Sequence, residues 1–169
     1  MSRHDQRRDR LRRLLRRTPA DGLLVTNFTN VTYLTGFTGD DSFLLLTPSS
    51  AVVISDGRYT QQLSEECPEL DVAIRKPGTE MLDAVTKAVR SAKLGKLGIE
   101  ASSMTVAFCD ALSKELPRVE ILSTSNLVEQ LREVKDADEV AEIRAAIDIA
   151  QRAFAVVSAS LRPDRTEKE

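Results

Sequence analysis

Histidine, cysteine and aromatic residues are scarce in this sequence. Its 169 residues include one histidine, two cysteines, no tryptophan and 4% aromatics. We expect the helix carrying His4 to be frayed at its start, which excludes Ser-His-Asp or Cys-His catalysis and a histidine-based metal centre from any ordered site. Cys67 and Cys109 form no CxxC pair, which argues against a zinc site and fits a reducing compartment. The core must therefore consist mainly of aliphatic side chains.

Long apolar runs and phosphate-binding glycine motifs are also missing. No run approaches the roughly 18 residues of a membrane span, and no signal peptide is visible. Neither GxGxxG nor GKS or GKT occurs, which argues against a phosphate cradle. With 41% hydrophobic and 30% charged residues, the chain has the composition of a globular protein and the length of one compact domain. These features predict a cytoplasmic protein.

Positive charge is concentrated at the start of the chain. Residues 1–20 contain eight arginines and two aspartates, a net charge of +6, which leaves −8 for the rest of a chain whose formal net charge is −2. A basic arm can indicate contact with nucleic acid or a membrane. We instead predict an amphipathic helix with Leu11, Leu14 and Leu15 on one face and the arginines on the solvated face, because the remainder is acidic and lacks basic-aromatic clusters.

Strand and helix patterns alternate over residues 23–122. Residues 59–66, 79–89 and 104–116 have helical composition or spacing. Short apolar runs bounded by turn residues predict strands at residues 23–26, 42–47, 51–55, 71–74, 97–99 and 119–122. The second and third of these strands are separated by a short turn and form an expected hairpin. The pattern predicts an α/β domain, in which helices flank a mixed β-sheet.

The end of the chain follows a different pattern. Asp136 or Asp138 can cap a long helix, whose apolar residues recur at alternating spacings of three and four: Val140, Ile143, Ile147, Ala150, Phe154, Val157 and Leu161. This seam extends beyond what the α/β domain needs. We place a boundary near residue 135, so that residues 1–135 form the α/β domain and residues 136–169 form a linker and a helix of another domain. Without a partner domain, we expect the seam to pair with a second copy.

Acidic and basic side chains in two loops are candidate site residues. Asp40, Asp41 and Asp56 could supply oxygen ligands to a hard cation, but their spacing matches no EF-hand, and we interpret them as surface acids. Arg58 follows a predicted strand, where it could hold a substrate carboxylate or pair internally with Asp56, and we favour the ion pair. Two glycines and two adjacent acids predict that residues 37–41 form a mobile, solvent-facing loop.

Five segments occur in an order that resembles a known family. They are Asn30–Phe37 (NVTYLTGF), Asp56–Tyr59 (DGRY), Leu97–Glu100 (LGIE), Leu131–Lys135 with Glu139, Ile143 and Arg144, and Leu161–Glu167 (LRPDRTE). Together they resemble the amino-terminal domain of the creatinase, prolidase and Xaa-Pro aminopeptidase family. The last segment departs from the family pattern, since Asp164 replaces a glycine. The resemblance implies a creatinase amino-terminal-domain-like, ribonuclease H-like fold.

The resemblance also implies a function. Members are metal-dependent Xaa-Pro dipeptidases or aminopeptidases, whose pita-bread catalytic domain binds two divalent ions (Mn, Co or Zn) through two Asp, one His and two Glu downstream of the Thr-Glu turn. None of these ligands can be mapped here, so we interpret the chain as the fragment before that domain and expect it to be inactive alone, with no metal or catalytic residue of its own. It would contribute to a homodimer and gate peptides with proline second, through Phe37, Asp40, Asp41 and Arg58.

Three other functions stay open. The chain could belong to a catalytically dead relative that uses the same fold for binding. It could instead be the amino-terminal domain of a creatinase-type amidinohydrolase, because the residues that separate the activities lie mainly in the catalytic domain. An independent α/β ligand-binding module is the third, and it would require a natural stop after Glu169.

Overall fold

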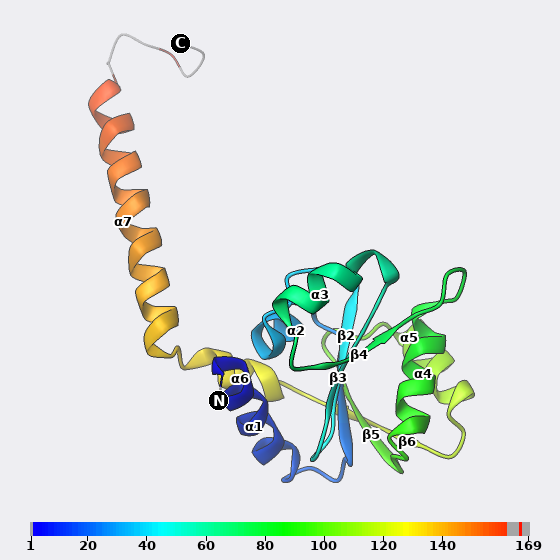
Figure 1. Ribbon diagram of the computed structural model, residues 1–169. Coiled ribbons are helices and arrows are strands. Elements are labelled where there is room, and N and C mark those ends of the chain that lie inside the picture. Colours follow the sequence, from blue (N-terminus) through cyan, green and yellow to red (C-terminus); the bar gives the residue numbers. More distant parts are fainter. Residues whose placement is uncertain (1, 162–165, 167–169) are drawn as a thin grey trace. The chain divides into compact units, whose positions relative to one another are not determined.

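The computed structural model describes residues 2–161 and residue 166 and divides into two compact units, Met1–Arg132 and Glu133–Glu169 (Figure 1). The first unit is an α/β sandwich and the second consists mainly of one long helix. The mixed α/β architecture predicted from the sequence is confirmed. The assignment of residues 136–169 to another domain stays a prediction.

A six-stranded mixed sheet forms the centre of the first unit. The strands are β1 (Gly22–Val25), β2 (Ser42–Leu46), β3 (Ala51–Ser55), β4 (Asp71–Ile74), β5 (Lys96–Glu100) and β6 (Glu120–Thr124). Their order is β4-β3-β2-β1-β5-β6, and β2 runs antiparallel to both of its neighbours while the other pairs are parallel. The expected hairpin joins β2 and β3, with Ser42 opposite Ser55 and Leu46 opposite Ala51. Apolar runs form the central strands because helices cover both faces.

Helices cover the two faces of the sheet in two groups (Figure 1). One face carries α1 (Arg3–Leu15), α2 (Phe28–Thr35), α3 (Thr60–Glu66), which follows the short 3-10 helix η1 (Gly57–Tyr59), and α6 (Leu127–Glu133). The other face carries α4 (Met81–Ser91) and α5 (Val106–Glu115). The second unit contains α7 (Ala137–Ser160). The first unit therefore has three layers, with a separate apolar core on each side of the sheet.

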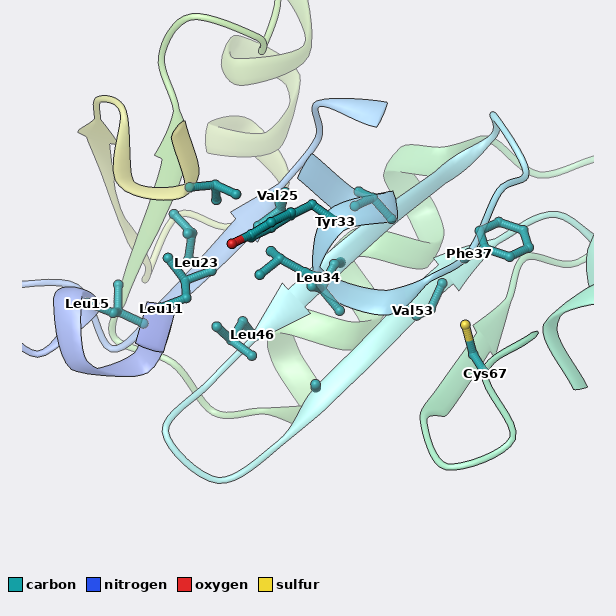
Figure 2. Packing of buried hydrophobic residues seen from close by; sticks show 14 of the residues in the cluster. Leu11, Leu15, Leu23, Val25, Tyr33, Leu34, Phe37, Leu46, Val53 and Cys67 are labelled. Atoms are coloured by element: carbon teal, nitrogen blue, oxygen red, sulfur yellow. The ribbon is translucent and has the colours of Figure 1, made fainter. Parts of the chain in front are cut away.

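Aliphatic side chains dominate the core on the α1 and α2 side (Figure 2). Leu11 and Leu15 of α1, Leu23 of β1 and Leu34 of α2 are all at most 2% exposed. Cys67 lies in the same cluster, where burial raises the pKa of its thiol to about 11. Since the thiolate is the reactive form, this cysteine is an inert core residue at neutral pH.

Helix α2 occupies a segment to which the sequence analysis assigned no element. Asn27 caps its start by accepting a hydrogen bond from the Asn30 N–H at 3.2 Å. Gly36 ends it in the left-handed region, with φ of 83°. A Cβ at Gly36 would also lie 2.8 Å from Nε2 of His4, so the backbone conformation requires glycine and a larger residue would in addition displace the His4 ring.

Helix α1 corrects two expectations. Its start is ordered, because Ser2 and Asp5 form a reciprocal capping box. Arg7 and Arg8 are buried and do not lie on a solvated face; their Nη1 atoms donate to the carbonyl oxygens of Tyr33 at 3.1 Å and Leu34 at 2.8 Å. The last carbonyls of a helix lack intrahelical partners and carry its negative dipole end. Two arginines of α1 therefore cap the carboxyl end of α2.

Helix α7 forms most of the second unit. Asp136 and Glu139 make a capping box at its start, and none of its side chains is buried. Ile143, Ile147 and Phe154 are 45%, 48% and 74% exposed. Leu161 follows the helix in an extended conformation, so the helical part of the seam ends earlier than predicted. The predicted Thr-Glu turn at residues 161–167 lies mostly outside the described residues. No helix in the described part of the chain combines the length and apolar character that crossing a membrane requires.

Candidate functional site

Three chain segments meet at one end of the sheet and bring all four predicted site residues together. We call this group the loop cluster: Phe37, Asp40, Asp41, Asp56, Arg58, Tyr59 and Arg75. The first segment is the loop between α2 and β2, the second is the turn that follows β3, and the third is the residue after β4. Because β3 and β4 are parallel, their carboxyl ends deliver the second and third segments to the same edge.

An aromatic pair anchors the cluster from beneath. Phe37 is fully buried, and its ring meets the ring of Tyr59 edge-on, with centroids 5.6 Å apart and an interplanar angle of 87°. The Tyr59 hydroxyl donates a hydrogen bond to the carboxylate of Asp40, which lowers the pKa of Asp40 and raises that of Tyr59. The prediction that the whole loop faces solvent is therefore wrong for Phe37 and for Gly39, which are buried. Phe37 is buried although its neighbours in the loop are polar, because the core has space for the whole ring.

Arg58 forms the ion pairs that the sequence analysis favoured. Its Nε lies 2.9 Å from Oδ1 of Asp56, and its Nη2 lies 3.2 Å from Oδ2 of Asp41. The hydrogen bond and charge of Asp56 raise the pKa of Arg58. The Arg58 side chain nevertheless stays 68% exposed, and exposed pairs contribute little to stability. The guanidinium is therefore oriented by its partners while remaining accessible from solvent.

Arg75 is the residue of this cluster that sequence reasoning missed. Its Nη2 lies 2.5 Å from Oδ2 of Asp56 and 3.4 Å from Oδ2 of Asp41, and its Nη1 donates to the carbonyl of Thr79 at 2.7 Å. It thus ties together the loop before β2, the turn after β3 and the segment before α4. The signal that could have found it is its place directly after a strand parallel to the one that precedes Asp56.

The charges of the loop cluster are nearly balanced. Three carboxylates face two guanidiniums. Asp41 and Asp56 form ion pairs with Arg58 and Arg75, and Asp40 accepts the hydrogen bond of the Tyr59 hydroxyl. Over residues 2–161, no group of three or more His, Cys, Asp or Glu side chains is arranged to hold a metal ion. The arrangement can present charged groups to a ligand, and it contains no nucleophile paired with a base.

A second polar network joins three of the recognised sequence segments. The carboxylate of Glu100, 6% exposed, accepts hydrogen bonds from the N–H groups of Thr26 at 2.7 Å and Asn27 at 2.8 Å and from Nδ2 of Asn30 at 2.6 Å. Nη1 of Arg132 donates to Oδ1 of Asn30 at 2.8 Å. Burial raises the pKa of Glu100. The network fixes the start of α2 to β5 and α6, so its role is structural.

The chain is similar to known proteins over most of its length. Residues 7–134 match the Creatinase/Prolidase N-terminal domain. The chain is 30% identical over 159 residues to the uncharacterized peptidase YqhT of Bacillus subtilis (strain 168), which covers 94% of this chain and 44% of that protein. An Xaa-Pro dipeptidase from Bacillus anthracis matches with a TM-score of 0.90 and 29% identity over 97% of this chain and 45% of that one.

A solved domain adds a third comparison. The N-terminal domain of cytoplasmic peptidase PepQ from Mycobacterium tuberculosis H37Rv matches with a TM-score of 0.68 and 34% identity, over 75% of this chain and 98% of that chain. The chain therefore spans less than half the length of the first two relatives and nearly all of the third.

Proposed function

The chain belongs to the Creatinase/Prolidase N-terminal domain family, and from this premise we propose that it is the non-catalytic amino-terminal domain of a metal-dependent Xaa-Pro dipeptidase or aminopeptidase. The observation that best supports this proposal is the similarity to an Xaa-Pro dipeptidase over 97% of the chain at a TM-score of 0.90. The parent protein would continue into a catalytic domain, act in the cytoplasm as a homodimer and cleave peptides with proline at the second position. Two divalent ions in that domain would supply the activated water.

The loop cluster is the part of this domain that we assign to substrate gating. Phe37 and Tyr59 hold the loop to the core, and Asp40 and Arg58 remain exposed above them. Arg75 and Asp56 orient Arg58 without covering it. An oriented, exposed guanidinium can bind a peptide carboxylate, and exposed acids can bind or repel a charged terminus. Gating by these groups would act on substrate entry, while the chemistry stays in the catalytic domain.

Kinetics of the full-length parent protein test the assignment. Replacement of Asp40→Ala and Asp41→Ala together should change kcat/KM for Xaa-Pro dipeptides by roughly tenfold, which corresponds to about 1.4 kcal/mol of transition-state binding. The thermal midpoint should change little, since Asp40 is exposed and the ion pairs of Asp41 are partly solvated. Asp110→Ala, an exposed acid on α5, is the matched control. Unchanged kcat/KM across several substrates would remove the gating role. Absence of any Xaa-Pro turnover with Mn, Co or Zn would remove the peptidase assignment itself.

A further inference from the structure

Strand β4 lies at one end of the sheet and leaves its outer edge open. Among the described residues no strand pairs with that edge. Two of its four residues are large, apolar and exposed, Val72 at 40% and Ile74 at 37%. We infer that this edge pairs antiparallel with β4 of a second copy of the chain, so that the two sheets become one. The inference names a surface for the homodimer proposed above and rests on that part of the proposal alone.

The backbone of β4 presents free hydrogen-bonding groups at the right positions. The N–H of Arg75 donates inward, to the carbonyl of Ser55 at 2.9 Å. In a strand, successive residues direct their N–H and C=O groups to opposite sides, so Ala73 also bonds towards β3. Val72 and Ile74 consequently direct both groups to the open edge. An edge of this kind, with apolar side chains and no proline within the strand, is a template for further strand pairing.

The side chains of β4 are complementary to themselves when two copies run antiparallel. A two-fold axis beside Ala73 places Val72 opposite Ile74 of the second copy, and these are the residues whose N–H and C=O groups face outward. The same register places Asp71, which begins the strand, opposite Arg75 of the second copy. Asp56 and Asp41 hold the guanidinium of Arg75. The neighbouring exposed Lys76 is therefore the cation that is available to face Asp71. Parallel pairing in register would set Asp71 against Asp71. Opposite charges across a strand pair stabilise it and like charges destabilise it, which selects the antiparallel arrangement.

A groove beside β4 leaves room for the second copy. It has a volume of about 600 Å³ and lies between α4 and the sheet, reaching from β4 over Val52 of β3 to Leu45 of β2. Ala84 and Ala88 of α4 line it, and such small side chains allow close approach of another backbone. The strand at the opposite edge of the sheet differs in its charges. There β6 begins with Glu120 and ends with Thr124, so it offers no basic residue to a second copy of itself.

Site-specific cross-linking is the first test. Ala73 would lie next to its copy across the two-fold axis, where the Cβ atoms of directly opposite residues are roughly 5 Å apart. Ala73→Cys should therefore form a covalent dimer under mild oxidation. Ser123→Cys on β6 is the matched control. Both variants keep Cys67 and Cys109, and the wild type shows how much cross-linking these two cysteines cause. Equal cross-linking at positions 73 and 123 would overturn the inference.

Sedimentation equilibrium is the second test. Val72→Lys with Ile74→Lys should weaken dimerisation roughly tenfold or more by placing like charges across the pair, while Val106→Lys, at a 78% exposed position on α5, should not. Each sample is also measured with Ile147→Asp and Phe154→Asp, which removes pairing through α7. A dimer that survives the β4 substitutions overturns the edge inference and leaves the homodimer. A full-length parent protein that is monomeric at all concentrations overturns both, and neither outcome bears on peptidase activity.

Discussion

Phe37 determines how the exposed Asp40 of the loop cluster is held. Its buried ring packs against Tyr59, and Tyr59 in turn binds Asp40. Phe37→Ala should lower the free energy of unfolding by about 3–5 kcal/mol, because a buried aromatic ring leaves a cavity that the core fills poorly. Asp40→Ala, three residues away at the surface, is the control and should leave the urea midpoint unchanged. An equal loss in both variants would show that Phe37 does not anchor the loop.

His4 provides a second test at the scale of one residue. It is half-buried, its Nδ1 lies 3.2 Å from the carbonyl oxygen of Tyr33, and burial lowers its pKa below 6.5. The neighbouring charges of Arg7, Arg3 and Arg8 act in the same direction. Because the unfolded chain then binds the proton more readily, this contribution to stability is present above pH 6.5 and is lost as pH falls through the folded pKa.

Because the chain has a single histidine, the pKa of His4 can be measured directly by NMR. The His4 ring resonance should titrate with a midpoint below 6.5 in the folded protein and near 6.5 in urea. His4→Gln should flatten the dependence of stability on pH between 5 and 7 relative to the wild type. A folded midpoint at or above 6.5 would contradict the burial of the ring against α2.

At the scale of elements, α1 stabilises α2 from outside. Arg8 is 3% exposed, donates to the carbonyl of Leu34 at 2.8 Å and forms an ion pair with Asp5. Arg8→Ala would leave a buried carbonyl without this partner, and we expect a loss of roughly 1–3 kcal/mol in the free energy of unfolding. Arg10→Ala, on the exposed face of the same helix, should change it by less than about 0.5 kcal/mol. Similar losses in the two variants, measured by denaturant unfolding, would mean that the arginines of α1 act only through net charge.

At the scale of the whole molecule, the two units differ in how they are stabilised. The first has two buried cores of its own, and a solved N-terminal domain of a relative matches 75% of the chain over 98% of its own length. The second consists mainly of a helix without buried side chains. Fully burying one Val, Leu, Ile or Phe contributes about 1.5–3 kcal/mol, so the exposed stripe of α7 is where a further partner would contribute most.

The sequence by itself determined the secondary structure of the sheet and of the tail. Short apolar runs located all six strands, the hairpin turn predicted the pairing of β2 with β3, and the seven-residue rhythm with its aspartate cap located α7. These features depend on neighbours within a few positions, and that is why they can be read locally. The five sequence segments likewise identified the family, because their residues and their order along the chain can be read without a structure.

Only the tertiary structure decided which polar residues are buried and which meet. The sequence named Asp40, Asp41 and Arg58, but not Arg75, which reaches Asp41 from 34 positions away. It placed Arg8 in solvent and Phe37 in a solvent-facing loop, and both are buried. An arginine is buried only where carbonyl groups that lack other partners accept its hydrogen bonds. An aromatic ring of a loop is buried only where the core has space for it. Both conditions are set by segments distant in sequence, so no local pattern contains them.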